Sequence, residues 1–247
     1  MAALGTRTWL NIASLALFCC PGLGQETTPS GKMSLDSIVE ALEKAQTAVH
    51  PQVSYQVIRE YRLFGAGANS DVIAEVDFSA LGITQYRIRN SSGSNRGRQV
   101  VRAVLDNEVE ASSTGNLART ALSRANYDFT YIGEEPLDGQ PCYRLGLKPK
   151  RKAKELISGQ VWVDKQSALV RQIEGEIAKT PSWWLKKVRV KLTLADLDGT
   201  WLQTGMEAVA DVRMLGPHTL TSRVVDYSGA AEIALTGTGT RAAARKQ

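Results

Sequence analysis

The sequence predicts an α+β protein that is mainly β, in which a strongly curved antiparallel sheet forms an incomplete β-barrel and about three helices cover its concave side. Apolar and polar residues alternate in about ten short segments, which is the period of a half-buried strand. The helical period occurs in only three segments. In the later strands one face is apolar and the other is charged, as in an antiparallel sheet with a single core-facing side. Such a sheet buries its apolar face by curving around the helices.

Three segments are predicted to be helical. The first covers residues 35–49, where Ser37 and Glu40 have the spacing of a capping box. The other two cover residues 98–113 and 116–125, in which apolar residues recur three and four positions apart.

The predicted strands are short and are separated by Gly, Pro, Asp or Ser turns. Asp138-Gly139 and Asp198-Gly199 are the clearest hairpin signals. The strands are expected at residues 53–63, 72–78, 82–89, 127–132, 142–147, 159–164, 168–178, 183–194, 201–214 and 219–227.

The composition is that of a globular protein with one domain, or at most two. Of 247 residues, 43% are hydrophobic and 22% are charged, which excludes a disordered or fibrous chain. Three cysteines and two histidines are too few for a disulfide scaffold, a zinc ribbon or a haem module, so no cofactor and no structural metal is expected. The net charge of +5 is mild, and acidic residues are interspersed with basic ones, so no nucleic-acid partner is expected.

Residues 1–24 have the layout of a signal peptide. A single charge, Arg7, precedes an apolar run of about a dozen residues, and Gly24 supplies a small residue at the expected cleavage site. The run is shorter than the roughly 20 residues of a membrane span. In an alternative interpretation, Cys19 or Cys20 is lipidated and the chain is a membrane-anchored lipoprotein. Both interpretations place the protein outside the cytoplasm, and the first places it in the periplasm.

The exported part of the chain divides into three sections. Residues 25–32 have the composition of a linker, residues 33–228 form the folded domain, and residues 229–247 form a flexible tail. After cleavage Cys142 is the one remaining cysteine, and it is expected to be a buried apolar residue.

The sequence gives little support for catalysis, so the protein is not expected to be an enzyme. It contains no Gly-x-Ser-x-Gly elbow, no His-Glu-x-x-His pair and no phosphate-binding glycine loop. His50 and His218 are expected to be surface residues at a helix end and in a turn. Two acidic pairs are expected to face solvent: Glu134 with Glu135, and Glu174 with Glu176.

Several motifs in the second half of the chain carry a resemblance to a known family. They lie in residues 148–152, 159–164, 169–175, 181–184 and 198–204, and include Trp162-Val163-Asp164, Trp183-Trp184 and Gly199-Thr200-Trp201-Leu202. This pattern resembles the C-terminal half of outer-membrane lipoprotein-sorting proteins of the LolA/LolB-like superfamily. The resemblance covers roughly residues 35–227 and is strongest from Tyr127 onward, although Gln203 stands where proline is usual.

The resemblance implies an incomplete barrel whose helices close a hydrophobic cavity. It further implies that the cavity holds acyl chains of lipoproteins or other lipids in the periplasm. Carriers of this type use an arginine near the cavity mouth, and three arginines in the early strands are candidates for it: Arg59, Arg87 and Arg89.

The proposed cavity lies on the apolar face of two late strands. Ala208 and Ala210 are small enough to leave room beside larger neighbours, although each position also fits a filled core. The predicted lining is Trp184, Val188, Val190, Leu192, Leu202, Met206, Ala208, Ala210 and Val212.

A membrane contact is predicted at two places. Trp183 is expected to point outward, where an indole beside cations suits a lipid headgroup region. A basic loop with Lys148, Lys150, Arg151, Lys152 and Lys154 is the second place, and its alternative interpretation is an ordinary solvated turn.

The sequence therefore predicts an exported lipid-binding and lipoprotein-binding protein, a periplasmic carrier in outer-membrane lipoprotein sorting. Its partners would be the acyl chains of lipoproteins or phospholipids, with a transient membrane contact. The alternative is a non-enzymatic protein-interaction or envelope-stress sensor module on the same scaffold, with a filled interior.

Overall fold

A computed structural model describes residues 33–48, 54–79, 82–111, 118–180 and 182–229. The predicted signal peptide and linker, His50 and the predicted tail from residue 230 lie outside these ranges.

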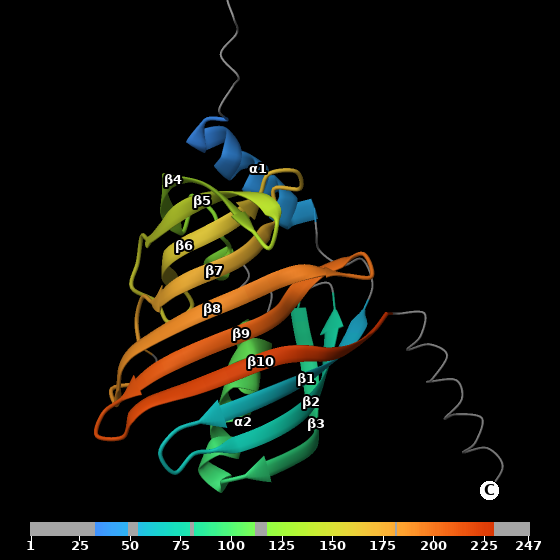
Figure 1. The fold of residues 1–247 in the computed structure, drawn as a ribbon, viewed down its shortest axis with the longest axis vertical. Coiled ribbons are helices and arrows are strands. Elements are labelled where there is room, and N and C mark those ends of the chain that lie inside the picture. Colours follow the sequence, from blue (N-terminus) through green and yellow to red (C-terminus); the bar gives the residue numbers. More distant parts are fainter. Residues whose placement is uncertain (1–32, 49–53, 80–81, 112–117, 181, 230–247) are drawn as a thin grey trace, which may run out of the picture. The chain divides into compact units, whose positions relative to one another are not determined.

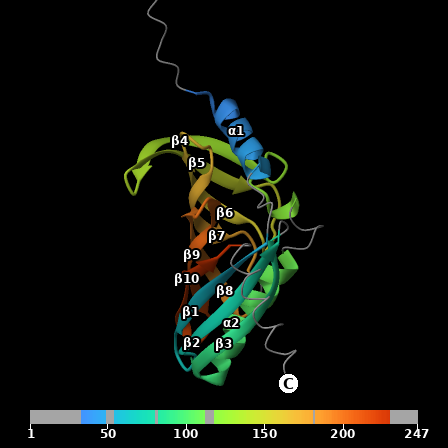
Figure 2. The same ribbon diagram turned by 90° about the vertical axis from the view of Figure 1, so that its right-hand side faces the viewer.

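The described chain forms a single 10-stranded antiparallel sheet in the order β3-β2-β1-β10-β9-β8-β7-β6-β5-β4 (Figure 1). The edge strands β3 and β4 are not paired with each other, so the sheet is open. Both helices lie on the same face of the sheet (Figure 2). This confirms the predicted α+β architecture with an incomplete barrel. The elements are α1 (Leu35–Ala48), β1 (Tyr55–Phe64), β2 (Ser70–Ser79), β3 (Gly82–Gly93), α2 (Asn95–Ala111), β4 (Tyr127–Leu137), β5 (Gln140–Pro149), β6 (Ile157–Asp164), β7 (Val170–Ile177), β8 (Leu185–Leu197), β9 (Thr200–Val212) and β10 (Gly216–Ser228).

Two antiparallel runs make up this sheet. One is β1 to β3, and the other is β4 to β10, and they are joined by pairing between β1 and β10. In this pairing Tyr61 lies opposite Ser222. Alternation within each strand does not specify this partner, because every strand with one apolar face satisfies the same pattern.

The two predicted Asp-Gly hairpins are confirmed. Asp138 and Gly139 have φ values of 50° and 80°, and Asp198 and Gly199 have 51° and 81°. Positive φ at both central residues is the geometry whose twist matches that of the flanking strands, and Asp-Gly adopts it readily.

Helix α1 begins at the predicted residue, Leu35, and α2 begins three residues before its predicted start. The Ser34 hydroxyl accepts a hydrogen bond from the Ser37 amide at 3.1 Å, so Ser34 caps α1 and the predicted capping box of Ser37 with Glu40 is wrong. The Ser94 hydroxyl accepts from the Gly97 amide at 3.1 Å in the same way, which places the start of α2 three residues earlier than predicted.

The third predicted helix is shorter than expected. The structure describes helix only over residues 118–120, and the following residues turn into β4. The buried Asn126 amide explains this end, because its Nδ2 donates to the carbonyls of Ala118 and Ala121 at 2.9 and 2.8 Å. These carbonyls are satisfied by a side chain in place of a continuing helix.

Each long helix covers a different end of the sheet with its own apolar core. Helix α1 packs against β4, and helix α2 packs against β3, β2 and β1. The α1 core contains Ile38, Val39, Leu42, Leu122, Tyr127, Leu145, Leu147, Ala153, Leu156, Val161, Val163 and Val170. The α2 core contains Tyr55, Val57, Tyr61, Leu63, Ala68, Val72, Ala74, Val76, Phe78, Ile83, Val101, Leu105, Leu202 and Leu220.

Helices α1 and α2 have 14 and 17 residues. Within the described ranges, no helix combines the length and the apolar character that crossing a bilayer requires.

Candidate functional site

A hollow of about 1050 Å³ lies between α2 and the helix-facing side of β8, β9 and β10. This volume is slightly above the roughly 300–1,000 Å³ that is typical of small-molecule sites. The sheet wall is apolar and consists of Val188, Val190, Met206, Ala208, Ala210, Val212 and Leu220. The α2 wall is mixed: Val100, Ala103 and Val104 are apolar, and Arg96, Gln99, Asn107, Glu108 and Glu110 are polar or charged.

The hollow exists because α2 has two apolar flanks. Val101 and Leu105 are fully buried in the core with β1–β3. Val100 and Val104 line the hollow on the neighbouring flank of the same helix. On the sheet side, Ala208 extends only a methyl group toward that flank. Small side chains on the sheet and a helix seated toward β1–β3 therefore leave apolar surface that no described element fills.

Seven of the nine residues predicted to line a cavity do line this hollow: Trp184, Val188, Val190, Met206, Ala208, Ala210 and Val212. Leu202 instead belongs to the α2 core. Leu192 is also absent from the lining, and it lies between Ile173 and Met206 on the neighbouring strands. Both leucines share the apolar face of their strands, but they lie farther from the hollow along β8 and β9.

The end of the hollow contains a histidine that was expected at the surface. His218 belongs to β10, is 9% exposed, and lines the hollow. Prediction failed because Gly216-Pro217 was interpreted as a turn that excluded the following residue from the strand. The imidazole lies directly over Gly65, where a Cβ would be 2.1 Å from the His218 Cδ2 atom. Glycine at position 65 is therefore required for this packing.

An ion pair anchors α2 beside the hollow. The buried Arg59 guanidinium on β1 lies 3.0 Å from the carboxylate of Glu108 on α2, and its other amino group donates to the Gln203 carbonyl at 3.3 Å. Glu108 also lines the hollow. Burial raises the pKa of Glu108, although the Arg59 charge opposes this effect.

Of the three candidate arginines, Arg59 is the one that contacts a hollow-lining residue among the described interactions. Arg87 and Arg89 lie on the edge strand β3 with largely exposed side chains, and both pair with Glu75. The sequence placed all three on plausible strands but gave no signal for Glu108, which appears as one acidic residue among several on α2.

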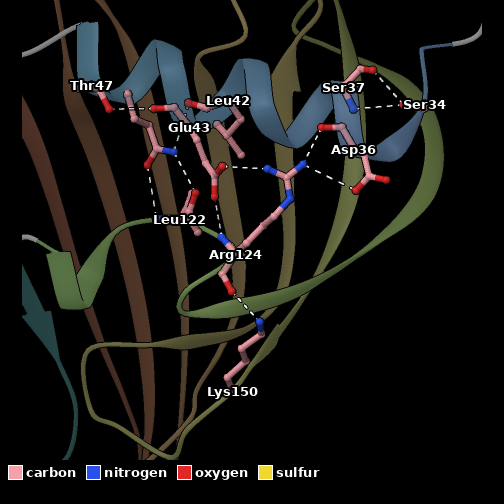
Figure 3. A network of polar contacts seen from close by, with 10 residues as sticks. Ser34, Asp36, Ser37, Leu42, Glu43, Thr47, Leu122, Arg124 and Lys150 are labelled. Carbon is pink, nitrogen blue, oxygen red and sulfur yellow. Dashed lines mark hydrogen bonds and ion pairs between the residues drawn. The ribbon is translucent and has the colours of Figure 1, made fainter.

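Part of the predicted basic loop is involved in contacts that hold α1 in place (Figure 3). The Arg124 guanidinium pairs with the Glu43 carboxylate on α1 at 2.9 Å and donates to the Asp36 carbonyl at 2.7 Å. Lys150 in turn donates to the Arg124 carbonyl at 2.6 Å and pairs with Asp128 at 3.6 Å. This cation therefore has a structural role within the chain.

Other cations of the loop are also engaged. Arg151 donates to the Asn126 side-chain oxygen at 2.6 Å, and Lys154 lies 3.9 Å from the Glu110 carboxylate. Lys148 and Lys152 are exposed. The loop borders the hollow only through Lys154 and Glu155. Its membrane contact stays a prediction.

Two tryptophans precede β8 and differ in environment. Trp183 is 84% exposed, and Trp184 is 41% exposed and lines the hollow. The strand predicted at residues 201–214 includes Met214, but β9 ends at Val212 and Met214 is fully exposed in the following turn. The sequence alternation continues past the end of the strand, which is why it misplaced Met214.

The described ranges contain no group of three or more His, Cys, Asp or Glu side chains arranged to hold a metal ion. Cys142 is a free, buried thiol, as predicted. Burial raises the pKa of this thiol. Glu134, Glu135 and Glu174 are exposed, as expected, and Glu176 is half-buried.

No family model and no curated protein matches this chain. In fold it is similar to a DUF1329 family protein from Desulfovibrio piger, at 16% identity and a TM-score of 0.43, over 78% of this chain and 92% of that one. It is also similar to a putative outer membrane lipoprotein-sorting protein domain from Vibrio parahaemolyticus, at 14% identity and a TM-score of 0.41, over 77% and 91% of the two chains. A LolA superfamily protein from Nitrosomonas europaea has 14% identity and a TM-score of 0.36, over 80% and 94%.

Proposed function

We propose that this protein binds lipid by holding acyl chains in the hollow between α2 and β8–β10. We further propose that it is an exported carrier that takes lipoproteins or phospholipids through the periplasm. The observation that carries the proposal is the hollow itself, whose sheet wall is aliphatic and faces the apolar side chains of Val100, Ala103 and Val104 on α2. A linear hydrocarbon matches such a surface because it needs no hydrogen-bond partner.

The energetics favour an acyl chain of ordinary length. Each buried methylene contributes about 0.8 kcal/mol, so a chain of about ten methylenes gains several kcal/mol after ordering costs. Polar groups lie at the border of the hollow, including an Arg119–Glu155 ion pair at 3.4 Å and Lys154. Apolar burial would supply the affinity, and these border groups would meet the polar end of the ligand.

The first test is native mass spectrometry with lipid extraction on the exported, purified chain. Phospholipid or acylated peptide bound at near one per chain, and released by an apolar competitor, is the expected result. A ligand-free protein that also fails to take up a fluorescent fatty acid would contradict the proposal. That outcome would favour the alternative of a protein-interaction or envelope-stress sensor module.

The second test fills the hollow. The double substitution Ala208→Leu/Ala210→Leu should abolish fatty-acid uptake without lowering the free energy of unfolding, because the added side chains enter open space. The matched control is Val209→Leu, which changes the opposite face of the same strand and should leave uptake intact. Unchanged uptake in the folded double variant would contradict the site. A loss of about 1–3 kcal/mol in stability would instead identify these positions as packed core.

A further inference from the structure

Four exposed apolar side chains gather where the hollow meets the end of the sheet. Trp183, Trp184, Met214 and Leu215, here called the apolar rim, are 84%, 41%, 102% and 44% exposed. They come from the segment before β8 and from the β9–β10 turn. The two segments are hydrogen-bonded, because the Arg213 amide donates to the Trp184 carbonyl at 2.9 Å.

Met214 is unfavourable for folding in two ways. Its φ of 67° lies in the left-handed region, which turns usually reserve for Gly, Asn or Asp. Its long apolar side chain is fully exposed to water at the tip of the turn. Glycine or asparagine would relieve both costs, so the methionine indicates a function other than stability.

The rim borders the hollow and is flanked by cations. Trp184 and Leu215 belong to the hollow lining, whereas Trp183 and Met214 are outside it and largely exposed to solvent. Exposed basic side chains lie on both sides: Lys179, Lys186, Lys187 and Arg213. Among the described residues, two carboxylates pair with them, Glu176 with Lys187 at 2.6 Å and Asp211 with Lys186 at 3.9 Å, so the described surroundings of the rim keep a positive excess.

We propose that the apolar rim docks onto the surface of an anionic phospholipid bilayer, with Trp183 and Met214 entering the headgroup region. Tryptophan is favoured at that depth, and nearby cations are attracted to anionic lipid. Protruding single side chains on turns suit a deformable lipid surface better than the preformed pocket of a protein partner. Docking in this way would place the mouth of the hollow at the bilayer, where an acyl chain can enter without crossing water.

The test is co-flotation of the exported, purified chain with vesicles. Vesicles of phosphatidylcholine containing phosphatidylglycerol should carry the protein, and pure phosphatidylcholine vesicles should carry much less. The variant Trp183→Ser/Met214→Ser should lower binding to the anionic vesicles about tenfold or more, because it removes both apolar side chains that enter the headgroup region on docking. The matched control is Tyr131→Ser/Ile132→Ser, which removes two exposed apolar side chains from the edge strand β4 and should bind like the unmodified chain.

Three outcomes would overturn the proposal: no flotation of the unmodified chain, equal flotation of the rim variant, or equal binding to both vesicle types. A rim-dependent dimer in sedimentation velocity, without flotation, would identify the occupant as a second copy of the chain. Fatty-acid uptake in the absence of vesicles separates this proposal from the proposed function. The rim variant should keep full uptake, because neither substituted side chain lines the hollow.

Discussion

Helix α1 lies on a continuous apolar core at the β4–β7 end of the sheet, whereas α2 packs one flank against β1–β3 and turns the other toward the hollow. The helix residues Ile38, Val39 and Leu42 are all buried to within 2%. On α2 only Val101 and Leu105 reach that level of burial. Both helices are amphipathic and the sheet is apolar beneath both. The difference shows that the hollow arises from where α2 is anchored, together with small side chains such as Ala208 on the sheet beneath its open flank.

The largest effect is expected from removing the Arg59–Glu108 ion pair that anchors α2. Arg59→Met removes the buried guanidinium from the half-buried Glu108 carboxylate and should lower the free energy of unfolding by about 2–3 kcal/mol at pH 7. Urea unfolding measures this change. The double variant Arg59→Met/Glu108→Met should recover much of the loss, and a double variant as unstable as the single one would contradict the coupling.

The same variant has a defined pH dependence. A carboxyl whose pKa is raised in the folded state costs stability as pH rises through that value, and the cost is absent at low pH. Because burial already raises the pKa of Glu108, removing Arg59 should raise it further. The difference in stability between Arg59→Met and the unmodified chain should therefore shrink as pH falls from 7 toward about 5. A constant difference would show that Glu108 is not the cause.

Two neighbouring valines on α2 give a matched comparison of the packed and the open flank. Val101→Ala should cost about 2 kcal/mol, because it leaves a cavity in the core. Val100→Ala should cost less than about 1 kcal/mol, because its side chain faces the hollow. Urea unfolding and fatty-acid affinity together check this prediction: the first variant should mainly lose stability and the second mainly affinity. Equal losses of stability would mean that the hollow is packed in solution.

The smallest effect is expected in the β6–β7 hairpin at the packed end. The buried Asp164 carboxylate accepts hydrogen bonds from the Ser167 amide at 2.9 Å and from the Arg171 guanidinium at 2.7 Å. Burial alone would raise the pKa of Asp164, but these bonds lower it below its ordinary value. Asp164→Asn should therefore cost about 1–2 kcal/mol at neutral pH.

A carboxyl with a lowered folded-state pKa stabilises the fold above its unfolded value and loses that contribution as pH falls through the folded value. The cost of Asp164→Asn should thus be constant above about pH 5 and should diminish below about pH 4. Asp196→Asn is the control, because the exposed Asp196 only accepts from the Gly199 amide at 2.8 Å. If both variants lose the same amount of stability with the same pH profile, the burial of Asp164 does not determine how much its carboxylate contributes to the free energy of unfolding.

Local pattern predicted most of the fold. Alternation on β8 and β9 identified the wall of the hollow, since each strand has period two and a single apolar face. Asp138-Gly139 and Asp198-Gly199 identified hairpins, because positive φ at two successive positions is a local requirement. These signals depend on neighbours in the sequence, so one sequence suffices to find them.

The features that prediction missed are non-local. Arg59 and Glu108 meet across 49 positions of sequence, and nothing near either residue marks the other as its partner. His218 becomes a lining residue because β10 begins earlier than the Gly-Pro pair suggested. Met214 was misplaced for the opposite reason: the apolar alternation of the sequence continues to Met214, but strand β9 ends two residues earlier at Val212. Strand ends and long-range pairs thus limited the prediction of the site.

Strand β10 is the last of the described strands in chain order, yet it lies between β1 and β9 within the sheet. Strands β1–β3 therefore have an unpaired edge until about 160 residues later in the chain become available. Such a long-range pairing makes folding slow compared with local hairpin formation, and it keeps the early strands open while the chain is still incomplete. The described sheet is therefore completed only when β10 becomes available.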